Sequence, residues 1–96
     1  MYAAVRRYEG ITNDAEAGRL VAESFVPLLQ DVPGFVAYYW IDAGDGVMAS
    51  LSVFETREGA DKSVQIARAW VAEHAPTLIP NPPRVIEGPV VASARA

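Results

Sequence analysis

Two neighbouring arginines near the start of the chain are the strongest candidates for chemistry. Arg6 and Arg7 lie in the middle of a predicted strand, and successive side chains of a strand point to opposite faces, so one of the two must point inward. A buried guanidinium needs a partner. It either anchors an acidic or phenolate ligand or forms an ion pair with Glu55, Glu87 or a residue of a second subunit. We take Arg6 as the candidate that holds an oxyanion.

Three consecutive aromatic residues, Tyr38, Tyr39 and Trp40, follow the Pro33-Gly34 turn. In a strand Tyr38 and Trp40 share one face and Tyr39 takes the other, so both faces carry large side chains. A sheet with helices on one side normally presents polar groups to water on the other side. The sequence therefore predicts that something covers the second face, and a second copy of the chain is the expected cover.

Two serines in the next apolar segment, Ser50 and Ser52, oppose these aromatic residues on the open face of the predicted sheet and leave room for a pocket. A two-residue turn at 45–46 sends Tyr39 to the face of the serines, whereas a three-residue turn sets Trp40 across from Ser50. Both registers stay open, and aromatic packing in a core or a dimer interface is the simpler alternative. In the ligand-site interpretation Tyr39 is the hydrogen-bond or proton partner, and the binding residues are Tyr38, Trp40, Ser50, Ser52 and Trp70.

Other signals for catalysis or metal binding are weak. Trp70 and His74 lie one helical turn apart on a predicted helix, where His74 near the carboxyl end is explained by the helix dipole. The chain has no cysteine, which excludes disulfides and thiolate metal sites. The "DAGDG" segment is too short for a calcium loop, and Ser24 has no nucleophile-elbow context. We therefore predict no metal and no cofactor.

Length and composition predict a single domain over residues 1–96. The chain is 51% hydrophobic and 21% charged, which is too apolar for a disordered protein. Its formal net charge of −4 gives no electrostatic reason to bind nucleic acid. No segment approaches the roughly 20 apolar residues that span a bilayer, and no signal peptide is recognisable. A cytoplasmic location without membrane partners is the expectation.

The periodicity of apolar residues predicts an element order of β, α, β, β, α, β. Strands are expected over 2–8, between the Pro33-Gly34 turn and residues 42–46, over 47–55 and over 84–91, with a tail at 92–96. Helices are expected over 14–30, where Pro27 should cause a bend or an early end, and over 56–74, capped by Thr56. A proline-rich connector spans 75–83. This order is that of the α+β ferredoxin-like fold, a four-stranded antiparallel sheet with two helices on one face.

The alternation of residues also predicts which side chains meet the helices. We place the apolar sets of the first and third strands there: Ala3, Val5, Val47, Ala49, Leu51 and Val53. The open face then carries Arg6, Tyr8, Met48, Ser50, Ser52 and Phe54. Such a face measures on the order of 400 Å², and covering it gains on the order of 10 kcal/mol before the cost of association. We expect a homodimer through the open sheet face.

The chain resembles the dimeric α+β barrel superfamily, and within it the antibiotic-biosynthesis-monooxygenase-like branch. The resemblance lies in the element order, in "PGF" before the second strand and in "LSVFETREGADKS", where the third strand ends in Phe-Glu and leads into the second helix. It implies two sheets packed face to face. Haem-degrading members use a strand-one Asn, a helix-two Trp and a more distant His; here only Trp70 matches loosely, and "YAAVRRY" has no Asn, so haem chemistry is not expected.

Two functions follow as hypotheses. The first is a homodimer with a mostly apolar pocket per subunit between sheet and helices, acting as a cofactor-independent monooxygenase on a small aromatic or polyketide-like molecule. In the family members that this hypothesis resembles, the electron-rich substrate itself reduces oxygen, while the protein orients the substrate and transfers protons. The alternative is a non-enzymatic homodimeric ligand-binding or interaction module whose aromatic strand is only an interface.

Overall fold

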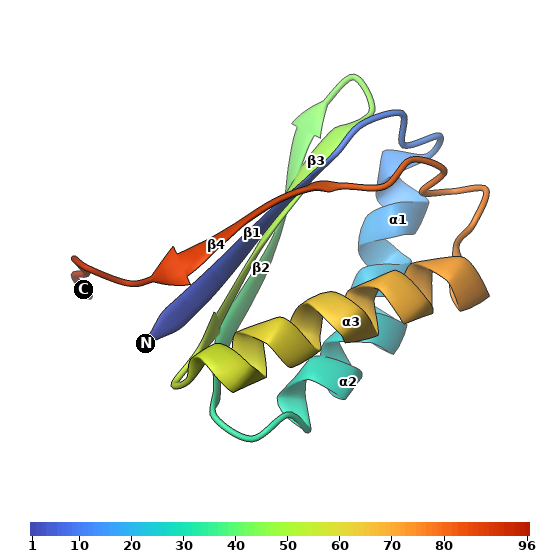
Figure 1. Ribbon diagram of the computed structural model, residues 1–96. Helices are drawn as coiled ribbons and strands as arrows, with labels where there is room; N and C mark the ends of the chain where they lie inside the picture. Colours follow the sequence, from blue (N-terminus) through green and yellow to red (C-terminus); the bar gives the residue numbers. More distant parts are fainter.

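The secondary structure forms two layers, a sheet and the helices that cover one of its faces (Figure 1). The computed structural model describes residues 1–96. The strands are β1 (Tyr2–Tyr8), β2 (Phe35–Gly44), β3 (Val47–Phe54) and β4 (Arg84–Pro89). The helical segments are α1 (Asp14–Leu20), η1 (Val21–Phe25), α2 (Val26–Gln30) and α3 (Arg57–His74). No helix combines the length and the apolar character that crossing a bilayer requires.

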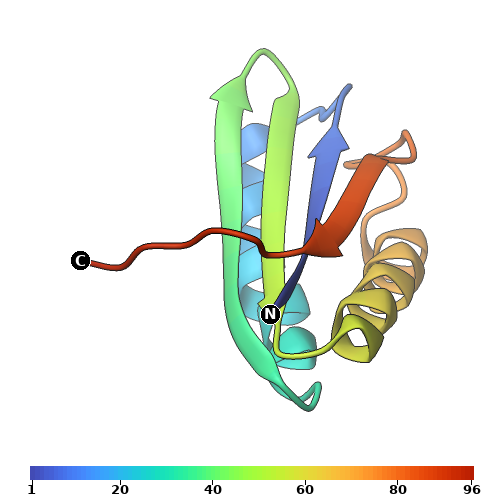
Figure 2. The ribbon, with the colours of Figure 1, turned by 60° about the vertical axis from the view of Figure 1, so that its left-hand side comes forward.

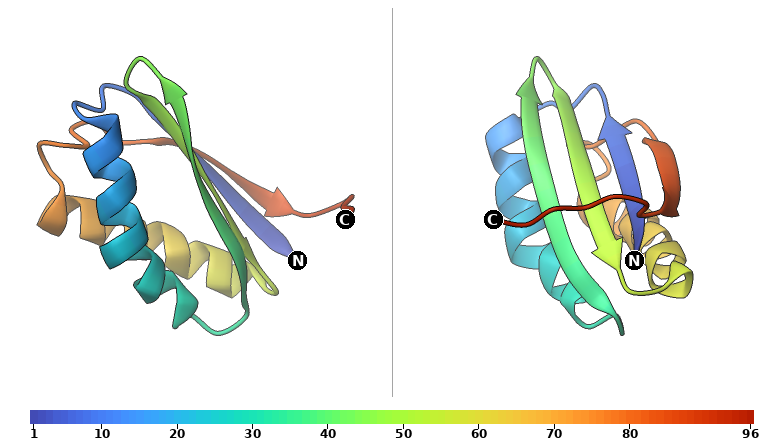
Figure 3. Two further views of the ribbon diagram at one scale, coloured as in Figure 1. Left: turned by 180° about the vertical axis from the view of Figure 1, so that it is seen from behind. Right: turned by 90° about the vertical axis from the view of Figure 1, so that its left-hand side faces the viewer.

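The strand order confirms the predicted ferredoxin-like fold. The sheet runs β2-β3-β1-β4, and every neighbouring pair is antiparallel. All the helices lie behind the sheet in the right-hand view of Figure 3, which leaves the other face without a covering helix. The chain after β4 leaves the sheet on this open side, away from the helices (Figures 1 and 2).

The first helical run starts at a side-chain cap and contains one widened turn. The Asn13 Oδ1 accepts a hydrogen bond from the backbone N–H of Glu16 at 3.1 Å, which satisfies a donor at the helix start. The segment η1 is a π-helix, in which the N–H of Val26 bonds the carbonyl of Val21. It ends two residues before Pro27, which lacks an N–H and would crowd the carbonyl four residues earlier in a regular α-helix. The run therefore continues to Gln30 through a wider turn instead of ending early.

The start of α3 matches the predicted cap. The Thr56 Oγ1 accepts a hydrogen bond from the N–H of Gly59 at 3.3 Å. Gly59 lies directly against β3, because a Cβ at this position would come within 2.9 Å of Cδ1 of Phe54. The close approach requires the absence of a side chain.

The hairpin between β2 and β3 settles the register. Asp45 and Gly46 form the two-residue turn, both with positive φ (53° and 76°), as the primed turns of hairpins require. A β-bulge between Asp42 and Gly44 adds one residue to β2, so Trp40 pairs with Ser50 as a three-residue turn would have placed it. Turn and bulge together send Trp40 to the helix side, and Tyr39 points to the open face.

The predicted faces of β1 and β3 are wrong. Met48, Ser50, Ser52 and Phe54 are the buried positions of β3 and face the helices, whereas Val47, Ala49, Leu51 and Val53 lie on the open face. In β1, Arg6 and Tyr8 are buried and Val5 is exposed. Arg6 pairs with Ser50 across the strands, so both strands changed face together. The prediction assumed that the more apolar of the two alternating sets of side chains meets the helices. In this sheet the more apolar set of β3 lies on the open face instead.

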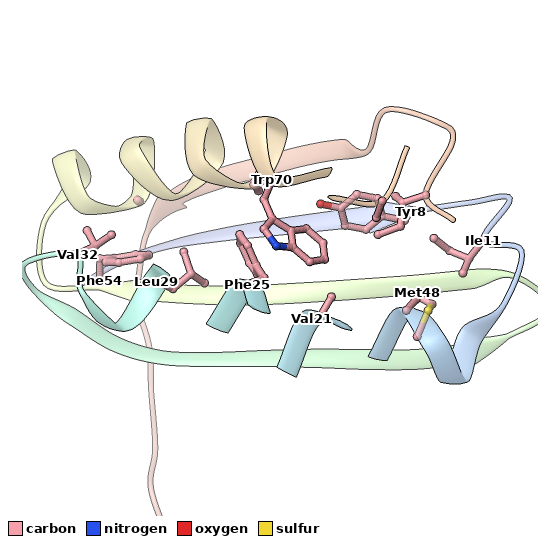
Figure 4. Close-up of a cluster of buried hydrophobic side chains, with 14 residues drawn as sticks. Tyr8, Ile11, Val21, Phe25, Leu29, Val32, Met48, Phe54 and Trp70 are labelled. Atoms are coloured by element: carbon pink, nitrogen blue, oxygen red, sulfur yellow. The ribbon is translucent and has the colours of Figure 1, made fainter. Parts of the chain in front are cut away.

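The core between the layers is aromatic. Figure 4 shows Trp70 from α3 beside Phe25 from η1, with Tyr8 from β1 on the far side of the indole. The rings of Phe25 and Trp70 are 5.4 Å apart between centroids, and those of Phe25 and Tyr38 are 5.5 Å apart. Ring pairs at these separations pack favourably beyond the area that they bury.

Candidate functional site

A buried arginine lies in the middle of this core. Arg6 is only 1% exposed. Its Nη2 donates to the Oγ of Ser52 at 3.0 Å, but its Nε and Nη1 have no hydrogen-bond partner. Neither Glu55 nor Glu87 forms an ion pair with it, so the predicted structural pairing within the chain is absent. A buried cation without a counter-ion is costly, which makes Arg6 the most unusual side chain of the molecule.

Aromatic groups take the place of a counter-ion around Arg6. Its guanidinium lies 6.0 Å from the ring centroid of Phe25, at the outer limit of a cation–π contact. Burial raises the pKa of Tyr8, and the positive charge of Arg6 opposes that rise. Burial likewise raises the pKa of Tyr38 to about 12, again against the effect of Arg6. Both phenols are therefore protonated near neutral pH and can donate hydrogen bonds.

Two further polar atoms of the core have no hydrogen-bond partner. The Oγ of Ser50 and the Nε1 of Trp40 are buried without a partner. The Trp40 ring lies 5.4 Å from the ring of Tyr8, between centroids. Buried polar atoms without partners are rare in folded proteins, and a group of them is a reason to expect a ligand or bound water.

Trp70 is fixed from the opposite side of the core. Its Nε1 donates to the Oγ of Ser24 at 2.8 Å, which connects α3 to the widened turn η1. Its ring lies 5.9 Å from that of His74. His74 is half exposed, at 47% for its side chain, and its closest acidic group is Glu73 at 4.0 Å. The histidine therefore lies outside the core.

A cavity of about 200 Å³ opens beside Arg6, between β1, β4, α3 and the proline-rich connector. Its lining is Arg6, Tyr8, Val64, Ala67, Arg68, Val71, Pro82, Pro83 and Val85. A second space of about 10 Å³ lies beside it, and its walls include Tyr8, Tyr38, Trp40 and Trp70. Tyr8, Ala67 and Val71 line both spaces, so the two are neighbours.

The structure brings together six of the seven residues proposed from the sequence. Arg6, Tyr38, Trp40, Ser50, Ser52 and Trp70 all lie between sheet and helices. Tyr39 lies on the opposite face and is 59% exposed, so it does not meet Arg6 within one chain. Tyr8 and Arg68 were not proposed. The alternation of β1 places Tyr8 on the face of Arg6, which was the available signal for it, whereas nothing in the sequence marked Arg68.

No protein-family model matches this chain. No curated protein is significantly similar to it in sequence. Solved structures are similar, however, and the NE2512 protein of unknown function from Nitrosomonas europaea has a TM-score of 0.78 at 23% identity, over 99% of this chain and 93% of that one. The monooxygenase ActVA-Orf6 of Streptomyces coelicolor, solved with nanaomycin D, has a TM-score of 0.72 at 17% identity, over 99% and 92% of the two chains.

A dimeric ferredoxin-like protein from an uncultured marine organism is also similar, with a TM-score of 0.66 at 12% identity over 100% of both chains. Identities this low establish a shared fold and no shared activity. The resemblance drawn from the sequence is confirmed at that level: this chain has the fold of the antibiotic-biosynthesis-monooxygenase-like proteins.

Proposed function

We propose that this protein binds a small aromatic or polyketide-like molecule in the cavity beside Arg6 and oxidises it with molecular oxygen, without a cofactor, as a homodimer. One observation carries the proposal. Arg6 is buried, faces the cavity and has no carboxylate partner. Ser52 accepts one hydrogen bond from it, the phenols of Tyr8 and Tyr38 lie beside its guanidinium, and its Nε and Nη1 nitrogens have no acceptor at hydrogen-bond distance. A ligand oxygen beside these nitrogens supplies the missing acceptor and, if it is an oxyanion, the missing negative charge. The shared fold with a monooxygenase supports the choice of reaction.

The chemistry suits a hydroxylated aromatic ring that has a keto tautomer with a CH₂ group. Loss of a proton from that carbon to a water molecule gives an enolate, whose oxygen Arg6 stabilises by charge and hydrogen bonding. Oxygen then accepts electrons from the enolate and bonds to the same carbon as a hydroperoxide. Loss of water from the hydroperoxide leaves a carbonyl. In sum, CH₂ and O₂ become C=O and H₂O, so the substrate supplies all four electrons.

Tyr8 is suited to donate a proton in this reaction, because it lines the cavity and its phenol stays protonated near neutral pH. Tyr38 lines the small neighbouring space and is protonated as well. The indoles of Trp40 and Trp70 line the small neighbouring space and not the cavity itself, so we assign them to its support. Ser52 holds the guanidinium of Arg6 through the hydrogen bond that it accepts, and Ser50 pairs with Arg6 across the strands. Tyr39 has no part in the cavity of its own chain, and we assign it to the subunit interface instead.

The dimer is proposed through the open sheet face. One row of side chains crosses all four strands on this face, and we call it the apolar row. It consists of Tyr39, Leu51, Val5 and Ile86, which pair across neighbouring strands. Tyr39, Val5 and Ile86 are 59%, 40% and 68% exposed in the single chain. A continuous apolar band of this kind is typical of a protein–protein interface. The dimeric protein of the same fold supports this assignment.

The test uses naphthoresorcinol, a two-ring substrate whose tautomer is a β-diketone. Wild-type protein should consume oxygen and form the hydroxyquinone, with one labelled oxygen atom entering the product when labelled O₂ is supplied. Arg6→Ala should abolish binding and turnover while the dimer persists. Arg7→Ala is the matched control, because Arg7 points to the opposite face and pairs with Glu9 at the surface.

The outcomes separate the two functions. Binding without oxygen uptake would favour the non-enzymatic ligand-binding module. Failure to bind any aromatic compound would overturn the site. In that case Trp40→Ala should destabilise the fold, because Trp40 packs against the core, without changing any chemistry.

A further inference from the structure

We propose that the ligand of this cavity is already an anion at neutral pH, a one- or two-ring aromatic acid with a carboxylate or a comparably acidic enolate, and that Arg68 at the cavity wall selects for it. This inference rests on the proposed function in one respect, that the cavity beside Arg6 is the ligand site. It adds the charge and size of the ligand and a second residue that recognises it.

The first support is the charge of the cavity lining. Arg6 and Arg68 both line the cavity, and no aspartate or glutamate does. This is unexpected in a chain with 12 acidic and 8 basic residues. Neither of the two arginines forms an ion pair, so no carboxylate of the chain neutralises their charge. A concave site lined by charge of one sign concentrates ligands of the opposite sign.

The positions of the two arginines suggest different roles. Arg6 is fully buried on β1 and forms the inner end of the cavity. Arg68 is exposed on α3 and shares the cavity wall with Pro82 and Pro83 of the connector. An exposed arginine at the wall attracts an anion from solution, and the buried arginine then holds it. Arg68 is thus a specificity-determining residue.

The second support is the lack of a base. No carboxylate and no histidine lines the cavity. Burial raises the pKa of Tyr8, the titratable neighbour of Arg6 in the lining, so its phenol does not accept a proton at neutral pH. A ligand of ordinary phenol acidity would therefore find no group to deprotonate it, whereas an acid that ionises in water needs none.

The third support is the size of the space. A buried apolar cavity of roughly 150 Å³ accommodates one benzene molecule, and the space beside Arg6 measures about 200 Å³. One ring fits with an acidic substituent, and a second ring extends toward the open side. A larger hollow, about 620 Å³, is instead a polar surface groove along Arg7, Glu9 and residues 81–84, where Arg7 is already paired.

The experiment compares acids with amides of the same shape. Benzoate and naphthoate, with benzamide and naphthamide as neutral counterparts, are titrated into the wild-type protein at low ionic strength and followed by calorimetry and tryptophan fluorescence. The acids should bind at least tenfold more tightly than the amides. Arg68→Gln should weaken binding of the acids severalfold, reduce its dependence on salt and leave the amides unchanged. Because Arg68 is exposed, this variant should fold normally.

A second surface cation of the same helix provides the control for charge. Lys62 is exposed on α3 and does not line the cavity. Lys62→Gln removes the same unit of positive charge from the protein as Arg68→Gln does, so it should leave the binding of the acids close to that of wild type.

Each result decides a different question. Equal affinity of acids and amides, or an Arg68→Gln variant that binds acids as well as wild type, would overturn the anion selectivity but leave the aromatic site of the proposed function intact. Equal weakening by Lys62→Gln and Arg68→Gln would overturn the specific role of Arg68. Binding of neither acids nor amides, nor of naphthoresorcinol, would overturn the proposed function as well.

Discussion

Replacing Ile86 by serine should dissociate the proposed dimer. Ile86 lies at one end of the apolar row and is 68% exposed in the single chain. Complete burial of such a side chain is worth about 1.5–3 kcal/mol. Covering the exposed two-thirds is therefore worth about 1–2 kcal/mol per subunit, and about 2–4 kcal/mol when twofold symmetry counts it twice. The dimer should dissociate roughly 30- to 700-fold more readily in Ile86→Ser.

Sedimentation velocity over a dilution series measures this change directly. Leu28→Ser is the control, because Leu28 is an apolar residue of α2 with comparable exposure, 45%, on the helix side. It should leave the dimer unchanged. Circular dichroism should show both variants folded, since neither side chain is in the core. A wild-type monomer at all concentrations, or equal weakening by both substitutions, would refute the assignment of the interface to the open face.

Three further predictions concern single groups. Burial raises the pKa of Tyr38 from 10.0 to about 12. As the pH rises from 10 to 12 the unfolded state therefore ionises first, and the free energy of unfolding should fall by up to about 3 kcal/mol. Urea titrations should show that Tyr38→Phe removes this loss. Burial and the neighbouring Asp42 raise the pKa of Asp14, and Asp42→Asn should lower that pKa in an NMR titration. Gly59→Ala should destabilise the fold by about 1–3 kcal/mol in denaturant unfolding, because its Cβ would crowd Phe54.

Contrary results would be equally specific. A Tyr38→Phe variant that still loses stability in this alkaline range would point to Tyr8, which burial affects in the same direction. If the pKa of Asp14 falls in Asp45→Asn but not in Asp42→Asn, the charge that repels the Asp14 carboxylate is that of Asp45 in the hairpin turn. A Gly59→Ala variant as stable as wild type would show that the neighbouring ring moves aside.

The sequence was sufficient to predict the architecture, because each element has local signals. The turn at Asp45-Gly46, the cap at Thr56 and the helical period of 57–74 are all properties of short segments, and the structure contains each of them. The order of these elements leaves few topologies for a four-stranded sheet.

The faces of the strands were not predictable in the same way. The alternation in β3 separates two sets of side chains but does not say which set meets the helices. The apolar set was the natural choice for the core, yet it lies outside, because the helix side of this sheet carries Arg6 and its serines. The β-bulge between Asp42 and Gly44 adds to the difficulty. Gly44, with a φ of 85°, suits it, but the same glycine was equally compatible with a plain turn. The composition of the site could therefore be predicted, but its side of the sheet could not.

The lone guanidinium of Arg6 also determines how the empty protein should respond to heat. Its positive charge is removed from water without a counter-ion, which lowers the melting temperature of the ligand-free form. An anion that binds only the folded state at 100 times its Kd adds about 2.7 kcal/mol, equivalent to a rise of roughly 10–20 °C for a domain of this size. Thermal melting against a collection of small acids can therefore identify the ligand without an assay for its reaction.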